Sequence, residues 1–226
     1  MTDARIAVVG STGRTGRLVL SEGVRRGSSM TAFTRRPKDL EGVQGLTAVV
    51  SGDGRNVEDL RGAFRGQDAV ISIVSSEGRG ATTVMSDVVR AELAAMQEVG
   101  VRRLVVVSVS AIEGNRPWIL INLVRWILRK PYADFGRMER LVRSSGLEWT
   151  IVRPPRLTNG EKTGRVRSVA GVKQLQNGPF SITRADLAAI LVDLAEGTRH
   201  AGETLLVSAA RGRGSGVSSS ISKASP

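Results

Sequence analysis

Three glycines near the start of the chain have the spacing of a phosphate-binding turn. Gly10, Gly13 and Gly16 follow an apolar run at 6–9 and lead into a segment with helical periodicity. Glycine lets the backbone turn tightly and approach a ligand closely, and the N-terminus of the next helix offers free N–H groups to a phosphate. This order of strand, turn and helix predicts that a dinucleotide binds here through its pyrophosphate. A plain tight turn is the alternative.

Three cations follow the second apolar strand, at 30–34. An NAD-binding protein is expected to place an acidic residue there, on the ribose 2′-hydroxyl, whereas this chain has Arg35, Arg36 and Lys38. Because a guanidinium binds two phosphate oxygens at once, we expect Arg35 to bind the 2′-phosphate of NADP(H), assisted by Arg36 or Lys38. A solvated basic loop is the alternative. Asp53, after the third apolar strand, stands where such folds place a carboxylate beside the adenine.

The elements that must position these residues alternate along the first two thirds of the chain, as βαβ units do. They predict an α/β, single-domain Rossmann fold with a doubly wound, mainly parallel sheet. We expect strands at 5–9, 30–34, 47–50, 69–74, 103–107 and 149–153, and helices at 14–26, 56–64, 81–99 and 135–145.

The C-terminal third breaks this alternation and predicts a small region that covers the substrate. The Rossmann domain should span 1–210, and 211–226, which has no apolar anchors, should be a disordered tail. The elements expected in this third are an edge strand at 165–169, a helix at 184–196 that Thr183 caps, and a final strand at 203–207.

Composition excludes several kinds of chemistry. The chain has no cysteine and a single histidine, His200, which rules out disulfides and thiolate catalysis and leaves little material for a zinc site. The longest apolar stretch, at 118–128, is too short to span a bilayer, and the first strand begins too early to leave room for a signal peptide. We therefore expect a soluble, cytoplasmic protein without a membrane span.

The net charge of +12 needs an explanation, because such a balance often marks proteins that bind nucleic acid. The arginines are scattered over the expected helices and loops, and four Phe, three Trp and one Tyr offer few rings for base stacking. A coding bias toward arginine is the simpler explanation, and attraction of an anionic cofactor and substrate is the main alternative. We expect no nucleic-acid partner.

Further motifs resemble a known family. Thr82-Thr83-Val84-Met85-Ser86, Arg137-Met138 and Pro154-Pro155, together with the glycine turn and Gly52-Asp53, are similar to the NAD(P)H-binding atypical short-chain dehydrogenase/reductases, and in particular to their flavin reductases. The similarity covers roughly residues 4–208. It implies a Rossmann fold, NADP(H) as the cofactor and reduction as the reaction.

The resemblance also implies roles for single residues. Ser110 matches the active-site serine of the family. Ser108 stands where the flavin reductases have a cysteine, so it either shares in catalysis or only bonds to the backbone. The cofactor roles go to Thr12, Gly13, Arg14 and Thr15 at the pyrophosphate, Arg35 at the 2′-phosphate, Asp53 and Gly54 at the adenine, and Val74, Ser75 and Met85 at the nicotinamide.

The catalytic tyrosine and lysine of ordinary short-chain dehydrogenases are not both present. Tyr132 is the only tyrosine, and Gly136 stands four residues on, where lysine would lower its pKa. Tyr132 is therefore either a weak proton donor or a packed aromatic residue near the mouth of the pocket. The missing pair disfavours alcohol oxidation and favours hydride delivery to an acceptor that takes its proton from water.

Two features could bind the substrate. Arg156 follows Pro154-Pro155 and could bind a carboxylate or phosphate, or it could be a surface arginine. Trp118 lies in the apolar segment 116–129, which could cover the nicotinamide pocket, form a homodimer contact or lie on a membrane surface.

Two functions remain open at this point. The first is an NADPH-dependent reductase of a flavin or another anionic or conjugated small molecule. The second is a redox-sensing binding protein similar to the NmrA regulators, which bind NADP without catalysis. Nucleic-acid binding is a third and weaker alternative.

Overall fold

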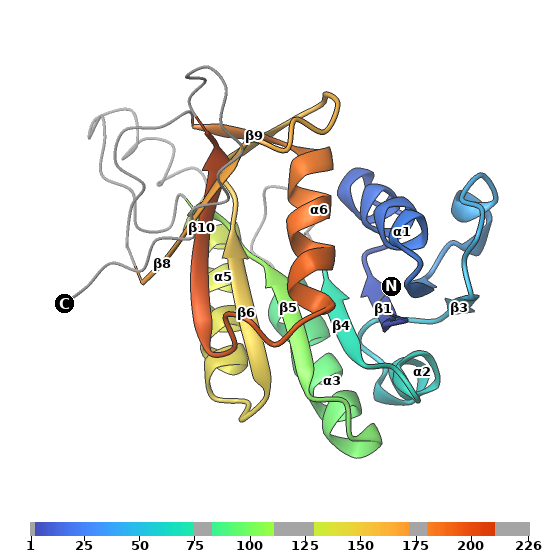
Figure 1. Cartoon of the computed structure of the whole chain (residues 1–226). Helices are drawn as coiled ribbons and strands as arrows, with labels where there is room; N and C mark the ends of the chain where they lie inside the picture. Colours follow the sequence, from blue (N-terminus) through green and yellow to red (C-terminus); the bar gives the residue numbers. More distant parts are fainter. Residues whose placement is uncertain (1–2, 75–82, 111–128, 172–179, 211–226) are drawn as a thin grey trace.

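A single mixed sheet forms the centre of the molecule (Figure 1). The computed structural model describes residues 3–74, 83–110, 129–171 and 180–210. The strand order is β3-β2-β1-β4-β5-β6-β10-β8. These strands are β1 (Arg5–Val9), β2 (Ser29–Thr34), β3 (Ala48–Ser51), β4 (Ala69–Ser72), β5 (Arg103–Val107), β6 (Glu148–Arg153), β8 (Val166–Ala170) and β10 (Glu203–Ala209).

Helices cover both faces of this sheet (Figure 1). On one face, Val19 and Leu187 bring α1 and α6 onto the core that Ile6 of β1 enters. On the other face, α2, α3 and α5 pack over a second core that includes Val9 and Phe33. The helices are α1 (Arg14–Arg26), α2 (Val57–Phe64), α3 (Val84–Val99), α5 (Arg129–Arg143) and α6 (Arg184–Ala195). The predicted α/β, doubly wound, single-domain Rossmann architecture is confirmed.

The order of the strands places a crevice beside β1. The chain runs outward from β1 to β2 and β3, and then crosses back to β4 on the other side of β1. In parallel α/β sheets, ligands bind at such a reversal, beyond the carboxyl ends of the strands. The strands of this sheet are parallel except for β8, which pairs antiparallel with β10. The alternating 165–169 segment predicted an edge strand, and β8 lies at the edge of the sheet.

Several element boundaries differ from the expected ones. Helix α5 begins at Arg129 and ends at Arg143, rather than spanning 135–145 as expected. Pro131 is compatible with this early start because the first turn of a helix does not use its N–H groups. At the other end, Gly146 has a φ of +71° and turns the chain toward β6. The fourth strand stops at Ser72 instead of residue 74, and the helix expected from residue 81 is described from Val84 onward.

Three short elements were not predicted from the sequence. A 3-10 helix, η1 (Pro37–Leu40), follows β2, and a small parallel pair joins β7 (Arg156–Thr158) to β9 (Ser181–Thr183) outside the main sheet. Thr183 ends β9 and also caps α6, its hydroxyl accepting from the N–H of Asp186 at 3.0 Å, as predicted.

Arg103, at the start of β5, is only 4% exposed, and its side chain binds the C-terminal end of α6. Its guanidinium donates to the carbonyl of Leu194 at 3.1 and 2.9 Å, to that of Arg199 at 3.3 Å and to that of Glu148 at 2.8 Å. The Leu194 carbonyl lies in the last turn of α6, at the negative end of the helix dipole, so a buried cation is favourable there.

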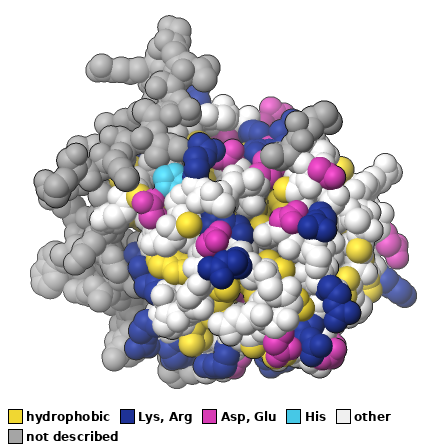
Figure 2. All heavy atoms as spheres, turned by 60° about the horizontal axis from the view of Figure 1, so that its bottom comes forward, with side chains coloured by type: hydrophobic (Ala, Val, Ile, Leu, Met, Phe, Trp, Pro, Cys, Tyr) yellow, Lys and Arg dark blue, Asp and Glu magenta, His cyan; other side chains and the backbone are white. Residues whose placement is uncertain are grey.

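The surface carries both signs of charge. On the face seen in Figure 2, lysine and arginine side chains are interspersed with aspartate and glutamate rather than gathered in one field. Within the described ranges, no helix has the length and apolar character needed to cross a membrane. The tail expected at 211–226 and the apolar segment around Trp118 lie outside the described residues.

Candidate functional site

The glycine turn brings β1, β4 and α1 into close contact. Gly10 has a φ of +80°, and a Cβ there would collide with the carbonyl oxygen of Ile73 beyond β4. A Cβ on Gly16 would collide with the carbonyl oxygen of Gly10. At Gly13 an added Cβ would meet the Gly10 oxygen at 3.3 Å, a tight contact that still allows an ordinary φ of −64°. Two of the glycines are therefore needed for the fold, and Gly13 is left to face the crevice.

The N-terminus of α1 has no internal acceptor for its first N–H groups. Gly13 is the N-cap, no side chain caps the helix, and its first turn contains no acidic residue. In α2, by contrast, the Asn56 side chain accepts from the N–H of Glu58 at 2.9 Å. An uncapped helix end with glycine before it attracts an anion, because N–H groups and the helix dipole both point outward.

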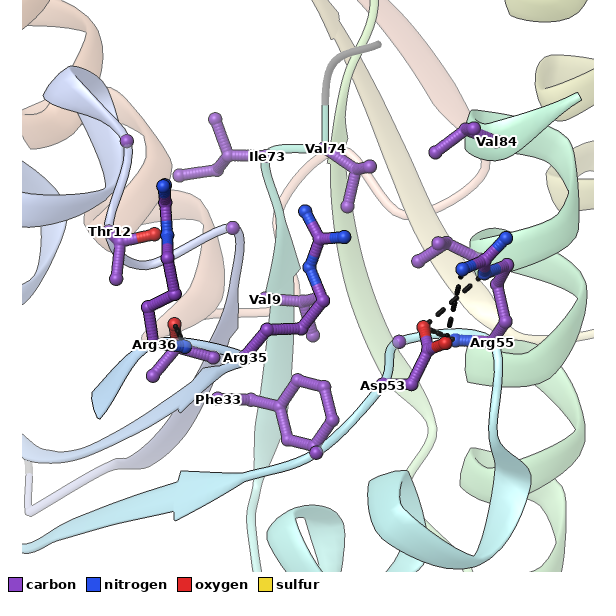
Figure 3. Close-up of a pocket in the computed structure, with 16 residues that line it drawn as sticks. Val9, Thr12, Phe33, Arg35, Arg36, Asp53, Arg55, Ile73, Val74 and Val84 are labelled. Carbon is purple, nitrogen blue, oxygen red and sulfur yellow. Dashed lines mark hydrogen bonds and ion pairs between the residues drawn. The ribbon is translucent and has the colours of Figure 1, made fainter. Parts of the chain in front are cut away.

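A cleft of about 250 Å³ begins at this helix end and runs along the carboxyl ends of the strands (Figure 3). Its apolar wall comes from Val9, Phe33, Val84 and Val88. Eight residues predicted to bind the cofactor line it together: Gly10, Thr12, Gly13, Arg35, Arg36, Asp53, Gly54 and Val74.

Three arginines line this cleft, and two of them form ion pairs with carboxylates. Arg36 pairs with Asp39 on η1 through Nε at 3.0 Å, and Arg55 pairs with Asp53 through Nη2 at 3.2 Å. Arg35 forms no ion pair among the described residues, although its charge acts on the nearby Asp53, and its guanidinium projects into the middle of the cleft (Figure 3). Arg35 therefore offers an unneutralised charge at the end of β2.

Residues 10–198 match the family described as NAD(P)H-binding. The chain belongs to this NAD(P)H-binding family. A curated relative, the (4-alkanoyl-5-oxo-2,5-dihydrofuran-3-yl)methyl phosphate reductase of Streptomyces griseus, is 32% identical over 208 residues, which cover 90% of this chain and 67% of the relative. The predicted resemblance to NAD(P)H-dependent oxidoreductases is confirmed.

Solved structures share the same fold. ChuY, described as an anaerobilin reductase from Escherichia coli, superposes with a TM-score of 0.76 at 18% identity, covering 94% of this chain and 100% of that one. A short-chain dehydrogenase/reductase from Veillonella parvula, solved in complex with NADP, has a TM-score of 0.72 at 17% identity and covers 91% of this chain and 94% of its own.

Other predicted cofactor residues of this NAD(P)H-binding protein lie away from the cleft wall. Thr15 and Gly16 lie behind the turn in the first turn of α1, Arg14 precedes them on the exposed side, and Lys38 lies on η1. Met85 is fully buried at the start of α3. Ser75 falls outside the described residues.

Ser108, one of the two predicted catalytic serines, belongs to a buried network. It is 1% exposed, and its hydroxyl donates to Oε1 of Glu139 on α5 at 2.6 Å. Arg153 of β6 donates to both oxygens of the same carboxylate, at 2.8 and 2.5 Å. Burial raises the pKa of Glu139, but hydrogen bonds from Arg153 and Ser108 outweigh burial and leave this pKa below its ordinary value. The Ser108 hydroxyl is thus committed to an ionised carboxylate.

Ser110, the other predicted serine, lies beyond the end of β5 and is half-buried, with its N–H donating to the Pro154 carbonyl at 3.2 Å. Tyr132 lies in α5, but its side chain is outside the described part of the chain, as is Trp118. Arg156 begins β7 and is exposed, away from the walls of the cleft. These positions stay predictions for the substrate side.

Another buried carboxyl lies on α3, the helix that supplies Val84 and Val88 to the cleft. Glu92 is fully buried on α3, where the hydroxyl of Ser72 donates to its Oε1 at 2.9 Å. Its Oε2 has no hydrogen-bond partner within the described ranges. Burial raises the pKa of Glu92 to about 8, so this group is mainly protonated at neutral pH.

Sequence reasoning missed Arg55 and the carboxylates that organise the site. Asp134 of α5 is completely buried and accepts from the N–H groups of Met85 and Ser86 at 2.9 and 3.3 Å, so one helix caps the other. The family motif at 82–86 hinted at this helix start, but no local signal connects it to a residue 48 positions away.

Proposed function

We propose that the protein is an NADPH-dependent reductase that transfers hydride to a flavin or another conjugated small-molecule acceptor. The observation that carries the proposal is Arg35, whose charge is unpaired within the described residues, at the end of β2. Its guanidinium projects into a cleft that begins at the uncapped end of α1. A cation at this point favours the 2′-phosphate of NADPH over the free hydroxyl of NADH.

The strand order gives the cofactor a direction in the cleft. With the pyrophosphate at Gly13 and the 2′-phosphate at Arg35, the adenosine half lies over the β2 and β3 side. The nicotinamide half then lies toward Val74 and the ends of β4 and β5, where Ser110 follows β5. NADPH supplies the hydride in this arrangement, and Ser110 is the hydroxyl that can donate to an acceptor, because Ser108 is engaged by Glu139.

The missing lysine after Tyr132 and the names of two similar reductases both favour a conjugated acceptor. The position four residues after Tyr132 is Gly136, so no lysine at that spacing activates the tyrosine to handle an alcohol proton. The Streptomyces griseus relative is named as a reductase of an unsaturated, conjugated lactone that carries a phosphate. ChuY is described as an anaerobilin reductase. A conjugated acceptor that takes its proton from water fits this set.

The test is a direct assay of the full chain with NADPH and with NADH. FMN, FAD, a tetrapyrrole and a quinone are offered in turn, and the loss of reduced-nicotinamide absorbance is followed. We expect oxidation of NADPH with at least one acceptor, and Ser110→Ala should slow it about tenfold to a hundredfold. Tyr132→Phe should have a much smaller effect. Tight NADPH binding without reduction of any acceptor would contradict the proposal and favour a redox-sensing regulator.

A further inference from the structure

The end of the cleft beyond Arg35 is lined by an aromatic side chain, by glycines and by Arg55. Phe33, which is only 2% exposed, lies at the bottom of this end of the cleft. The glycines of the turn between β3 and α2 pack on the Phe33 ring. A Cβ on Gly52 would lie 2.9 Å from the Phe33 ring, and one on Gly54 would lie 3.3 Å from Val88 Cγ1. Glycine at position 52 lets the turn pack directly against Phe33 and Asp59, and Gly54 packs against Val88. Phe33 and Val88 also line the cleft, so this end of it has an apolar floor.

An ion pair with two side-chain hydrogen bonds forms the outer wall of the same space. Arg55 donates to Oδ1 of Asp53 from its backbone N–H at 3.1 Å and from Nε at 3.3 Å, and to Oδ2 from Nη2 at 3.2 Å. Asp53 is itself fixed, because its N–H donates to Oδ2 of Asp59 at 2.9 Å. The hydrogen bonds from Arg55 lower the pKa of Asp53, so the pair persists through the neutral range.

Because one edge of its guanidinium is paired with Asp53, Arg55 differs from Arg35 in what it can recognise. A guanidinium engaged by a carboxylate on one edge has fewer N–H groups to offer a phosphate, but its flat faces can still stack on a ring. In Figure 3 the Asp53–Arg55 pair stands on one side of the cleft, and the Arg35 guanidinium stands between it and Thr12. The space between the two guanidinium groups has an apolar floor and cationic, planar sides.

We propose that Arg55, held in place by Asp53, is the platform on which the adenine ring of the dinucleotide stacks, whether or not a 2′-phosphate is present. The inference rests on the cofactor direction given in the proposed function, and it assigns affinity for the base to Arg55 and preference for the phosphate to Arg35. Purine rings stack well on guanidinium planes, and the electron-rich ring also attracts the cation.

Fragments of the cofactor test this assignment. The affinities of the full chain for 5′-ADP, 2′,5′-ADP and nicotinamide mononucleotide are measured by calorimetry for the wild type, Arg55→Ser and Arg55→Tyr. Arg55→Ser should weaken 5′-ADP and 2′,5′-ADP by the same factor, about three- to tenfold, and leave the mononucleotide unchanged. Arg55→Tyr, which restores a flat surface without charge, should recover most of the loss for both adenine fragments.

Arg61 provides the matched control. It lies on α2 just after this turn and forms a similar ion pair with Glu58 at 2.7 Å, outside the cleft, so Arg61→Gln should leave all three affinities unchanged. A loss confined to 2′,5′-ADP in Arg55→Ser would make Arg55 a phosphate ligand and overturn the proposal. No loss for either adenine fragment would also overturn it and leave only a surface ion pair. If the wild type binds 5′-ADP and 2′,5′-ADP equally, the role of Arg35 fails, but a shared loss in Arg55→Ser still supports stacking.

Discussion

Arg35 is placed to discriminate between two cofactors that differ by one phosphate group. Replacing it with alanine removes a charge-assisted contact to the 2′-phosphate, and we expect NADPH affinity to fall about tenfold to a hundredfold. NADH affinity should fall much less, because NADH has a free hydroxyl where NADPH carries this phosphate. Calorimetric titration of both cofactors against both proteins measures the effect. Equal affinity of the unmutated protein for NADPH and NADH would contradict the prediction.

Gly13 separates nucleotide binding from folding. Its backbone has an ordinary φ of −64° and an added Cβ meets only the Gly10 carbonyl within 4 Å, at 3.3 Å. Gly13→Val should therefore give a folded protein that no longer binds the dinucleotide, because the branched side chain takes the space of the phosphate oxygens. Circular dichroism and a binding titration are the measurements. Gly10→Val is the contrasting variant, and it should fail to fold stably because of its positive φ and the Ile73 carbonyl.

Single residues also show how far sequence reasoning reaches into a site. The glycine turn and Arg35 could be predicted because a strand, a turn and a helix follow one another in a fixed order along the chain. Arg55 could not, because its role depends on a pairing with Asp53 that looks like any of the many neighbouring charges in a chain with 33 basic residues. The Ser108 network joins partners 31 and 45 positions apart, to which no local pattern points.

At the scale of elements, Arg103 joins β5 to the end of α6. Arg103→Met keeps much of the volume but leaves the carbonyls of Leu194, Arg199 and Glu148 without these donors. We expect the free energy of unfolding to fall by about 2–4 kcal/mol. Urea unfolding measures the loss, and Arg102→Met at the exposed neighbouring position, with a 3.3 Å pair to Glu148, is the control that should change little. A similar small effect for both variants would argue that the buried guanidinium is not a cap.

The long parallel strands were predictable and the short elements were not. Strands buried on both faces read as continuous apolar runs, so β1, β4 and β5 were located to within two residues of their observed ends. The β7 and β9 strands have three residues each, too few for any period to show. The start of α5 was predicted six residues too late, because Lys130 and Pro131 do not look like the beginning of a helix. Proline is nevertheless tolerated in the first turn of a helix.

For the molecule as a whole, ion pairs of Glu22 connect α1 to residues that are far apart in the sequence. It accepts from Arg25, Arg26 and Lys162, and Arg26 continues to Glu196 at the end of α6 at 3.0 Å. The hydrogen bond from Arg25, helped by Lys162 and Arg26, outweighs burial and lowers the pKa of Glu22 to about 2 from an ordinary value of 4.5.

A carboxyl whose pKa is lower in the folded than in the unfolded chain stabilises the fold at pH values above the unfolded pKa. This contribution is lost as the pH falls from about 4.5 through about 2. Glu22→Gln should therefore be less stable than the wild type at pH 6, and the difference should shrink steadily toward pH ~2.5. Thermal unfolding of both proteins across this range is the measurement. A difference that is independent of pH would show that the charge of Glu22 is not what matters.

The pKa of Glu92 is raised on folding, whereas that of Glu22 is lowered, and folding therefore takes up protons at Glu92. In the unfolded chain this carboxyl is exposed to water and ionises with an ordinary pKa of 4.5, whereas the folded chain holds it protonated up to about pH 8. Between these limits each molecule that folds takes up about one proton at this position. Refolding in an unbuffered solution near neutrality should therefore make the solution more alkaline, and the measured enthalpy of folding should vary with the ionisation heat of the chosen buffer.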